Sequence, residues 1–112
     1  MTESRQYKLI WFVPETHATA TRDAVFEAGA GRQGDYEHCA WQCLGQGQFK
    51  PNADANPYLG EADRLEEVVE YRIETLVPAA ALKAVIAALR RSHPYEEPAF
   101  EVIELVSPAA WE

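Results

Sequence analysis

Several features that would assign a function at once are scarce or missing in this sequence. Basic residues number 10 against 18 acidic ones, so the formal net charge is −8. Nucleic-acid-binding proteins usually carry a basic patch, and anionic membranes attract basic surfaces rather than acidic ones. We therefore expect neither a nucleic acid nor a membrane as a partner.

Long apolar runs are lacking as well. Residues 1–6 (MTESRQ) are polar, without the apolar segment of a signal peptide. No apolar run approaches the roughly 18 residues that a membrane-spanning helix needs. We expect a cytoplasmic localisation.

Cysteine is scarce, with only Cys39 and Cys43 in the chain. Their C-x-x-x-C spacing matches no common zinc or redox motif. If both lie on one strand, their Cα atoms are roughly 13 Å apart, whereas a disulfide needs less than about 7 Å. We predict two reduced thiols, at least partly buried on a face shared with Trp41.

What the sequence does have is a regular alternation of apolar segments. Its 112 residues, 47% of them hydrophobic, fit one domain spanning 1–112. Strands are predicted at 7–13, 36–44 (with an extension towards 49), 68–77 and 100–106. Helices are predicted at 15–28 and 79–91, and residues 50–64 form a long loop of the kind that is often functional.

Each helix has an apolar stripe at three- and four-residue spacing. Thr16 is the predicted N-cap of the first helix, and Gly29 ends it. The predicted inner residues are Ala18, Thr21, Val25 and Ala28 in the first helix, and Leu82, Val85, Ile86 and Leu89 in the second.

The resulting β-α-β-β-α-β order predicts an α+β, ferredoxin-like fold. Right-handed crossovers give a four-stranded antiparallel sheet with both helices on one face. The other face stays bare in a monomer, with Trp11 and Trp41 expected near it. Such a face is usually covered by another subunit.

A glycine motif, G-x-G-x-x-G, spans residues 29–34. A dinucleotide site needs this pattern after a strand and at the start of a helix. Here it follows the first helix and precedes a strand, so we interpret it as a helix end and a turn.

The strongest candidate site is the run His93-Pro94-Tyr95-Glu96-Glu97-Pro98 after the second helix. Unsatisfied helix carbonyls, a rigid proline and two carboxylates meet there, and carboxylates suit divalent cations. We predict ligand binding by His93, Tyr95, Glu96 and Glu97, with His93 and Glu97 as candidate metal ligands. The alternative is a structural role, in which His93 caps the helix. His17 and His38 are weaker candidates.

Taken together, these stretches resemble the insert domain of YqfO-type proteins, the dinuclear-metal-centre family named for Nif-three. The matching runs are 13–17, 27–31, 34–36 with Cys39, 45–51, 55–60 and 93–97. The His-Pro-Tyr-Glu run is also similar to that of CutA-type proteins, which share the ferredoxin-like fold with PII-type signalling proteins. The CutA resemblance implies trimers and a link to divalent cations.

The resemblance does not extend to the metal-carrying lobes of the long family members, so we expect a stand-alone version of the insert. Three histidines cannot rebuild a two-metal centre. The sequence predicts a non-catalytic binding or regulatory module that forms a homo-oligomer, favouring a trimer. It identifies no cofactor, and a divalent cation or a small ligand is the candidate partner. Two alternatives remain open: an enzyme or enzyme subunit using His93 and Glu97 as acid–base groups, and an interaction domain for a separate protein.

Overall fold

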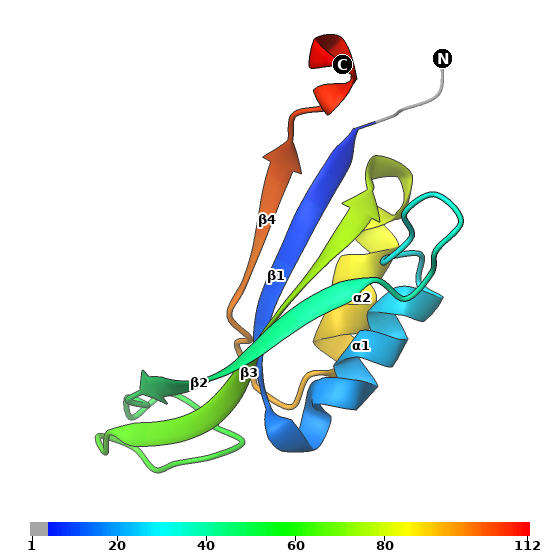
Figure 1. Cartoon of the computed structure of the whole chain (residues 1–112). Coiled ribbons are helices and arrows are strands. Elements are labelled where there is room, and N and C mark those ends of the chain that lie inside the picture. Colours follow the sequence, from blue (N-terminus) through cyan, green and yellow to red (C-terminus); the bar gives the residue numbers. More distant parts are fainter. Residues whose placement is uncertain (1–4) are drawn as a thin grey trace.

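The computed structural model describes residues 5–112, which form one sheet and two helices (Figure 1). A short 3-10 helix precedes each α-helix, and another, Pro108–Trp111, follows the last strand. None of the helices in the described range is long and apolar enough to cross a bilayer. The main elements are β1 (Gln6–Pro14), α1 (Ala18–Glu27), β2 (Ala40–Phe49), β3 (Glu66–Pro78), α2 (Leu82–Ser92) and β4 (Phe100–Leu105).

The four strands lie in the order β2-β3-β1-β4, and every neighbouring pair is antiparallel. Both α-helices cover the same face of this sheet and pack against each other (Figure 1). The predicted ferredoxin-like fold is therefore confirmed.

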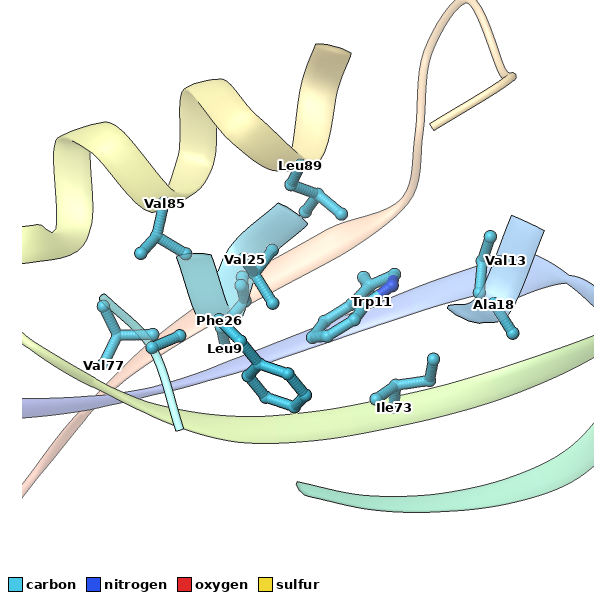
Figure 2. Packing of buried hydrophobic residues seen from close by; sticks show 11 residues of the cluster. Leu9, Trp11, Val13, Ala18, Val25, Phe26, Ile73, Val77, Val85 and Leu89 are labelled. Carbon is cyan, nitrogen blue, oxygen red and sulfur yellow. The ribbon is translucent and has the colours of Figure 1, made fainter. Parts of the chain in front are cut away.

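The core lies between the helices and the sheet (Figure 2). Trp11 is fully buried there, and its indole N–H donates to the hydroxyl of Thr21 in α1 at 3.0 Å. The prediction that Trp11 lies near the bare face was wrong. The strand alternation puts it on the same face as Ile73, its partner on β3. The helix stripes were predicted well, since Thr21, Val25, Val85 and Leu89 are all inaccessible to solvent.

The opposite face of the sheet is uncovered. Trp41 lies there opposite Glu74, as predicted, and is 59% exposed. Glu74 forms ion pairs with Lys8 (3.2 Å) and Arg72 (3.0 Å). Desolvation raises the pKa of the Glu74 carboxyl, but the hydrogen bonds and charges of Lys8 and Arg72 outweigh it and leave that pKa below its ordinary value.

The second strand begins later than predicted. β2 starts at Ala40, because residues 31–38 form a turn in which His38 has a positive φ of 57°. The extension to Phe49 is confirmed. Cys39 and Cys43 are free, as expected, but only Cys39 is partly buried. Cys43 is exposed because it lies on the uncovered face of an edge strand.

The start of the first helix also differs from the prediction. Glu15–His17 form a 3-10 helix, and no side chain caps either this turn or α1. The Thr16 hydroxyl instead lies 2.9 Å from Nδ1 of His17. The glycine motif follows α1 as a turn, with positive φ at Gly29, Gly31 and Gly34.

One end of the molecule projects beyond the helices (Figure 1). β1 ends at Pro14 opposite Glu70, so residues 66–69 of β3 pair only with residues 46–49 of β2. We call this projecting part of β2 and β3, with the loop of residues 50–65, the hairpin end. It gives the molecule its elongated extents of 51 × 26 × 25 Å.

Candidate functional site

A cavity of about 460 Å³ lies where the hairpin end meets the body of the domain. Its walls come from segments far apart in sequence: Phe12 of β1, residues 47–51, residues 57–59, Glu70 of β3 and residues 95–97 after α2. Strand alternation puts Phe12, Gly47 and Glu70 on the uncovered face of the sheet. The cavity therefore borders the same face as Trp41.

His93 fixes the turn that forms one wall of the cavity. It ends α2 with an extended backbone (φ −85°), and its side chain is only 6% exposed. Its Nε2 lies 2.7 Å from the carbonyl oxygen of Phe12, and Nδ1 accepts a hydrogen bond from the backbone N–H of Tyr95 at 3.1 Å. A carbonyl can only accept and an amide N–H can only donate, so the ring is neutral with its proton on Nε2. Burial lowers the pKa of His93, with the bond to Phe12 opposing and the charge of His17 adding to the effect.

Tyr95 connects this turn to the sheet. Its hydroxyl donates to Oε2 of Glu70 at 2.7 Å. Burial, followed by the bond to Glu70 and its charge, raises the pKa of Tyr95 far above its ordinary value, so the phenol remains a donor. The Glu70 carboxylate in turn lies across Gly47, where any Cβ would collide with it.

The loop over the cavity is held by a backbone bond and by rings. The N–H of Asn56 donates to Oε1 of Glu96 at 3.0 Å. The Tyr58 ring packs edge-on against His17 with centroids 5.7 Å apart, and lies 6.4 Å from the Tyr95 ring. The centroid of the Phe49 ring lies 5.9 Å from that of Tyr95. Such distances are typical of interacting aromatic pairs.

The charges around the cavity are unbalanced. Glu70, Glu96 and Glu97 line it, against Lys50 as the basic lining residue. Within residues 5–112, none of these three carboxylates forms an ion pair.

Three of the predicted site residues, Tyr95, Glu96 and Glu97, line the cavity, whereas His93 lies behind its wall. Among the described residues, no three His, Cys, Asp or Glu side chains gather as a metal site requires. Metal binding through His93 and Glu97 stays a prediction. A metal ion could bind His93 only after one ring nitrogen had lost its hydrogen bond to the backbone.

Four residues that build the site were not predicted from the sequence: Gly47, Phe49, Tyr58 and Glu70. Glu70 looked like an ordinary solvent-facing residue of an alternating strand. Tyr58 lies in a loop, and the periodicity of the sequence does not show where that loop lies relative to the sheet. The available signal was the family resemblance, since Gly47, Phe49 and Tyr58 lie in the matching runs 45–51 and 55–60. Glu70 lies outside all of these runs.

Comparison with known proteins identifies the relatives of this chain. A GTP cyclohydrolase 1 type 2 homolog of Mycobacterium leprae is 48% identical over 101 residues, which are 90% of this chain and 26% of that protein. The crystal structure of a Bacillus cereus protein related to NIF3 superposes with a TM-score of 0.80 at 40% identity, covering 96% of this chain and 27% of the other. The chain is a relative of one segment of the NIF3-related proteins. It matches no protein-family model.

The NIF3-related segment shares its fold with smaller proteins. The PII-like protein CutA of Nostoc, in its apo form, superposes with a TM-score of 0.64 at 17% identity, over 93% of this chain and 84% of that protein. This likeness shows the fold alone. Within the present structure, the NIF3-like stretches 45–51, 55–60 and 93–97 all contribute residues to the cavity.

Proposed function

We propose that this chain is a non-catalytic, oligomer-forming binding module whose small-ligand site is the cavity at the hairpin end. The observation that carries the proposal is that segments distant in sequence are tied together around that cavity by three polar contacts: His93 to Phe12, Tyr95 to Glu70 and Asn56 to Glu96. A volume of about 460 Å³ is within the range of small-molecule sites, and such sites combine apolar walls with a few placed polar groups.

The geometry favours binding over catalysis. His93 is the acid–base group of the enzyme alternative, yet both of its ring nitrogens are bonded to backbone groups. A general base must reach the proton that it removes, and His93 would have to leave these bonds to do so. Several relatives are named as GTP cyclohydrolase homologs, but this chain spans only 26% of the M. leprae protein.

The edges and the uncovered face of the sheet support the oligomer. β2 is an edge strand of ten residues, AWQCLGQGQF, with no charged side chain to oppose pairing with another chain. β4 is the other edge, so pairing of β2 with β4 of the next copy would be heterologous and could close a ring. A trimer is the ring we favour. The cavity borders this face, so ligand binding and assembly would influence each other.

Light scattering on a size-exclusion column tests the oligomer. We expect a trimer at tens of micromolar, which the Trp41→Glu variant dissociates because it puts a charge on the uncovered face. Trp111→Glu is the matched control, since Trp111 is 75% exposed outside the sheet. A monomeric wild-type protein would contradict this part of the proposal.

The ligand site can be located by an NMR fragment screen on the amide-labelled protein. We expect bound fragments to shift the amides of Gly47, Tyr58 and Tyr95, and Tyr58→Leu to weaken this binding several-fold. Zinc and copper titrations of wild type, His93→Ala and Glu97→Ala address the divalent-cation alternative in the same preparation. Fragments that shift only amides outside the cavity would overturn its assignment as the ligand site.

A further inference from the structure

We propose that the cavity at the hairpin end selects small organic cations, meaning amines, guanidines or quaternary ammonium groups attached to an apolar frame. This inference rests on the proposal that the cavity is the ligand site, and adds the chemical class of the ligand. Two independent properties of the walls support it: the aromatic rings and the unpaired carboxylates.

The rings offer a surface for a cation. Phe49, Tyr58 and Tyr95 come from three different segments, and the ring of Tyr95 lies 5.9 Å from Phe49 and 6.4 Å from Tyr58. A cation within about 6 Å of a ring centroid is attracted by the electrons of the ring face. Among the described residues, no Arg or Lys lies over any of these three rings. Their faces are therefore not occupied by a cation of the chain itself.

The fourth ring among the lining residues, that of Phe12, already contacts a cation of the chain. The Arg72 guanidinium lies 5.8 Å from the ring centroid of Phe12. Arg72 is also bonded to Glu74, outside the cavity lining. Phe12 thus illustrates within this chain the combination of ring and carboxylate that the proposed ligand would find.

The carboxylates favour cationic ligands over anionic ones. Glu70 is partly buried, and its only bonded partner among the described residues is the Tyr95 hydroxyl, which uses one oxygen. Glu96 likewise uses one oxygen, for the N–H of Asn56. The remaining oxygens can accept from a ligand, and attraction between opposite charges is stronger in a partly buried site than in bulk water. An anion would meet three carboxylates and a single lysine.

Glu70 is the decisive group because two neighbours hold it in place. The bond from Tyr95 fixes Oε2, and the absence of a side chain at Gly47 lets the carboxylate lie against the β2 backbone. A carboxylate held in this way loses little conformational freedom when a ligand binds, which favours affinity.

The test uses three probes that share one ring and differ in charge: benzyltrimethylammonium, benzyl alcohol and benzoate. Each is titrated into the full chain at low salt while the amides of Gly47 and Tyr95 are followed by NMR. We expect the cation to bind about tenfold more tightly than the other two, from cation–π and charge attraction together. Glu70→Gln should weaken the cation about tenfold and leave benzyl alcohol unchanged.

Two control variants distinguish the loss of a specific charge from a general loss of folding. The outcomes below also distinguish failure of the cation assignment from failure of the ligand site. Glu101→Gln removes an exposed carboxylate on β4 and should keep wild-type affinity. Tyr58→Leu, a second variant, should weaken the cation several-fold through the lost ring. If benzyl alcohol or benzoate binds in the cavity as tightly as the cation, or if Glu70→Gln binds like wild type, the cation assignment fails while the ligand site stands. If no probe shifts cavity amides in a protein that also binds no screening fragment there, the ligand site itself fails.

Discussion

The two ends of this molecule are stabilised by different kinds of contact. The helix-covered end is apolar: Leu9, Trp11, Ile73, Val25 and Leu89 are inaccessible to solvent and pack in one cluster (Figure 2). The hairpin end has no comparable cluster, and its rings are partly or largely exposed, with Tyr58 at 51%. It is held instead by a few polar contacts between segments distant in sequence.

The difference separates stability from function. Burial of large apolar side chains is the main favourable term in folding, so the helix-covered end determines whether the chain folds. Substitutions in the hairpin end should change the free energy of unfolding little, so its side chains can vary to suit a ligand. Substitutions at the two ends should therefore affect different measurements, and the following predictions test that separation.

The largest expected effect is at Trp11. Trp11→Ala should lower the free energy of unfolding by about 4 kcal/mol, because it leaves a cavity in the core and removes the hydrogen bond from the indole N–H to Thr21. Trp111→Ala, which alters a 75% exposed ring, should change it by less than about 0.5 kcal/mol. Urea unfolding of both variants is the measurement. Equal losses would contradict the assignment of the core.

Glycines at the two ends give a closer comparison. Gly31 has φ +83°, and a Cβ there would lie 2.7 Å from the Phe26 ring, so Gly31→Ala should destabilise the fold by about 2 kcal/mol. A Cβ at Gly47 would collide only with the Glu70 carboxylate, which would have to leave its place beside Tyr95 while the backbone stays unchanged. We expect it to lose ligand binding while its unfolding midpoint stays near wild type. Gly45→Ala, where a Cβ meets nothing within 4 Å, is the control. A Gly47→Ala variant as unstable as Gly31→Ala would contradict the proposed separation.

The sequence was informative where local rules decide. The alternation in residues 68–77 and the stripes of Val25, Val85 and Leu89 predicted the sheet, the helices and their inner faces, because each follows from the periodicity of one element. The error at Trp11 has a different cause. The continuously apolar run 7–13 does not show which face the helices cover, and only the pairing with Ile73 decides it.

The site was less predictable because it depends on long-range pairing. The run 93–97 was recognised, and three of its residues line the cavity. The contact between Glu70 and Gly47 could not be predicted in this way, since it comes from the register of β2 on β3, in which Gly45 lies opposite Glu70 and Gly47 opposite Val68. The start of β2 was predicted too early because residues 36–39 alternate like a strand, although the positive φ of His38 prevents pairing there.

The stability of the fold should depend on pH through His93, the histidine behind the cavity wall. Burial lowers the pKa of His93 in the folded protein, so the unfolded chain binds this proton at a higher pH. The stability that depends on neutral His93 is complete above the unfolded pKa of about 6.5. It declines as the pH falls through the lowered folded pKa, by at most about 1.4 kcal/mol per pH unit.

His93→Gln should flatten this decline, because glutamine can donate to Phe12 without titrating. Urea unfolding at pH 7.5, 6.5 and 5.5 gives the slopes. Thr75→Val, which removes a buried hydroxyl bonded to the carbonyl of Cys39, is the control and should lower stability equally at each pH. If His93→Gln keeps the wild-type slope, His93 is not the group responsible.

A small effect on stability is expected at Tyr95, within the site itself. Tyr95→Phe removes the bond to Glu70, and we expect a loss of about 1 kcal/mol or less, as for a single partly exposed hydrogen bond. The affinity for benzyltrimethylammonium should fall several-fold, because Glu70 loses one of the two neighbours that hold it. The ring faces remain, so binding is weakened but not abolished. Tyr71→Phe is the matched control, since that hydroxyl has no hydrogen-bond partner within residues 5–112 and does not line the cavity. Calorimetry and urea unfolding on the two variants compare binding with stability directly. If Tyr95→Phe and Tyr71→Phe lower the affinity and the stability to the same extent, the bond to Glu70 does not organise the site. The two ends of the molecule would then be less distinct than their packing indicates.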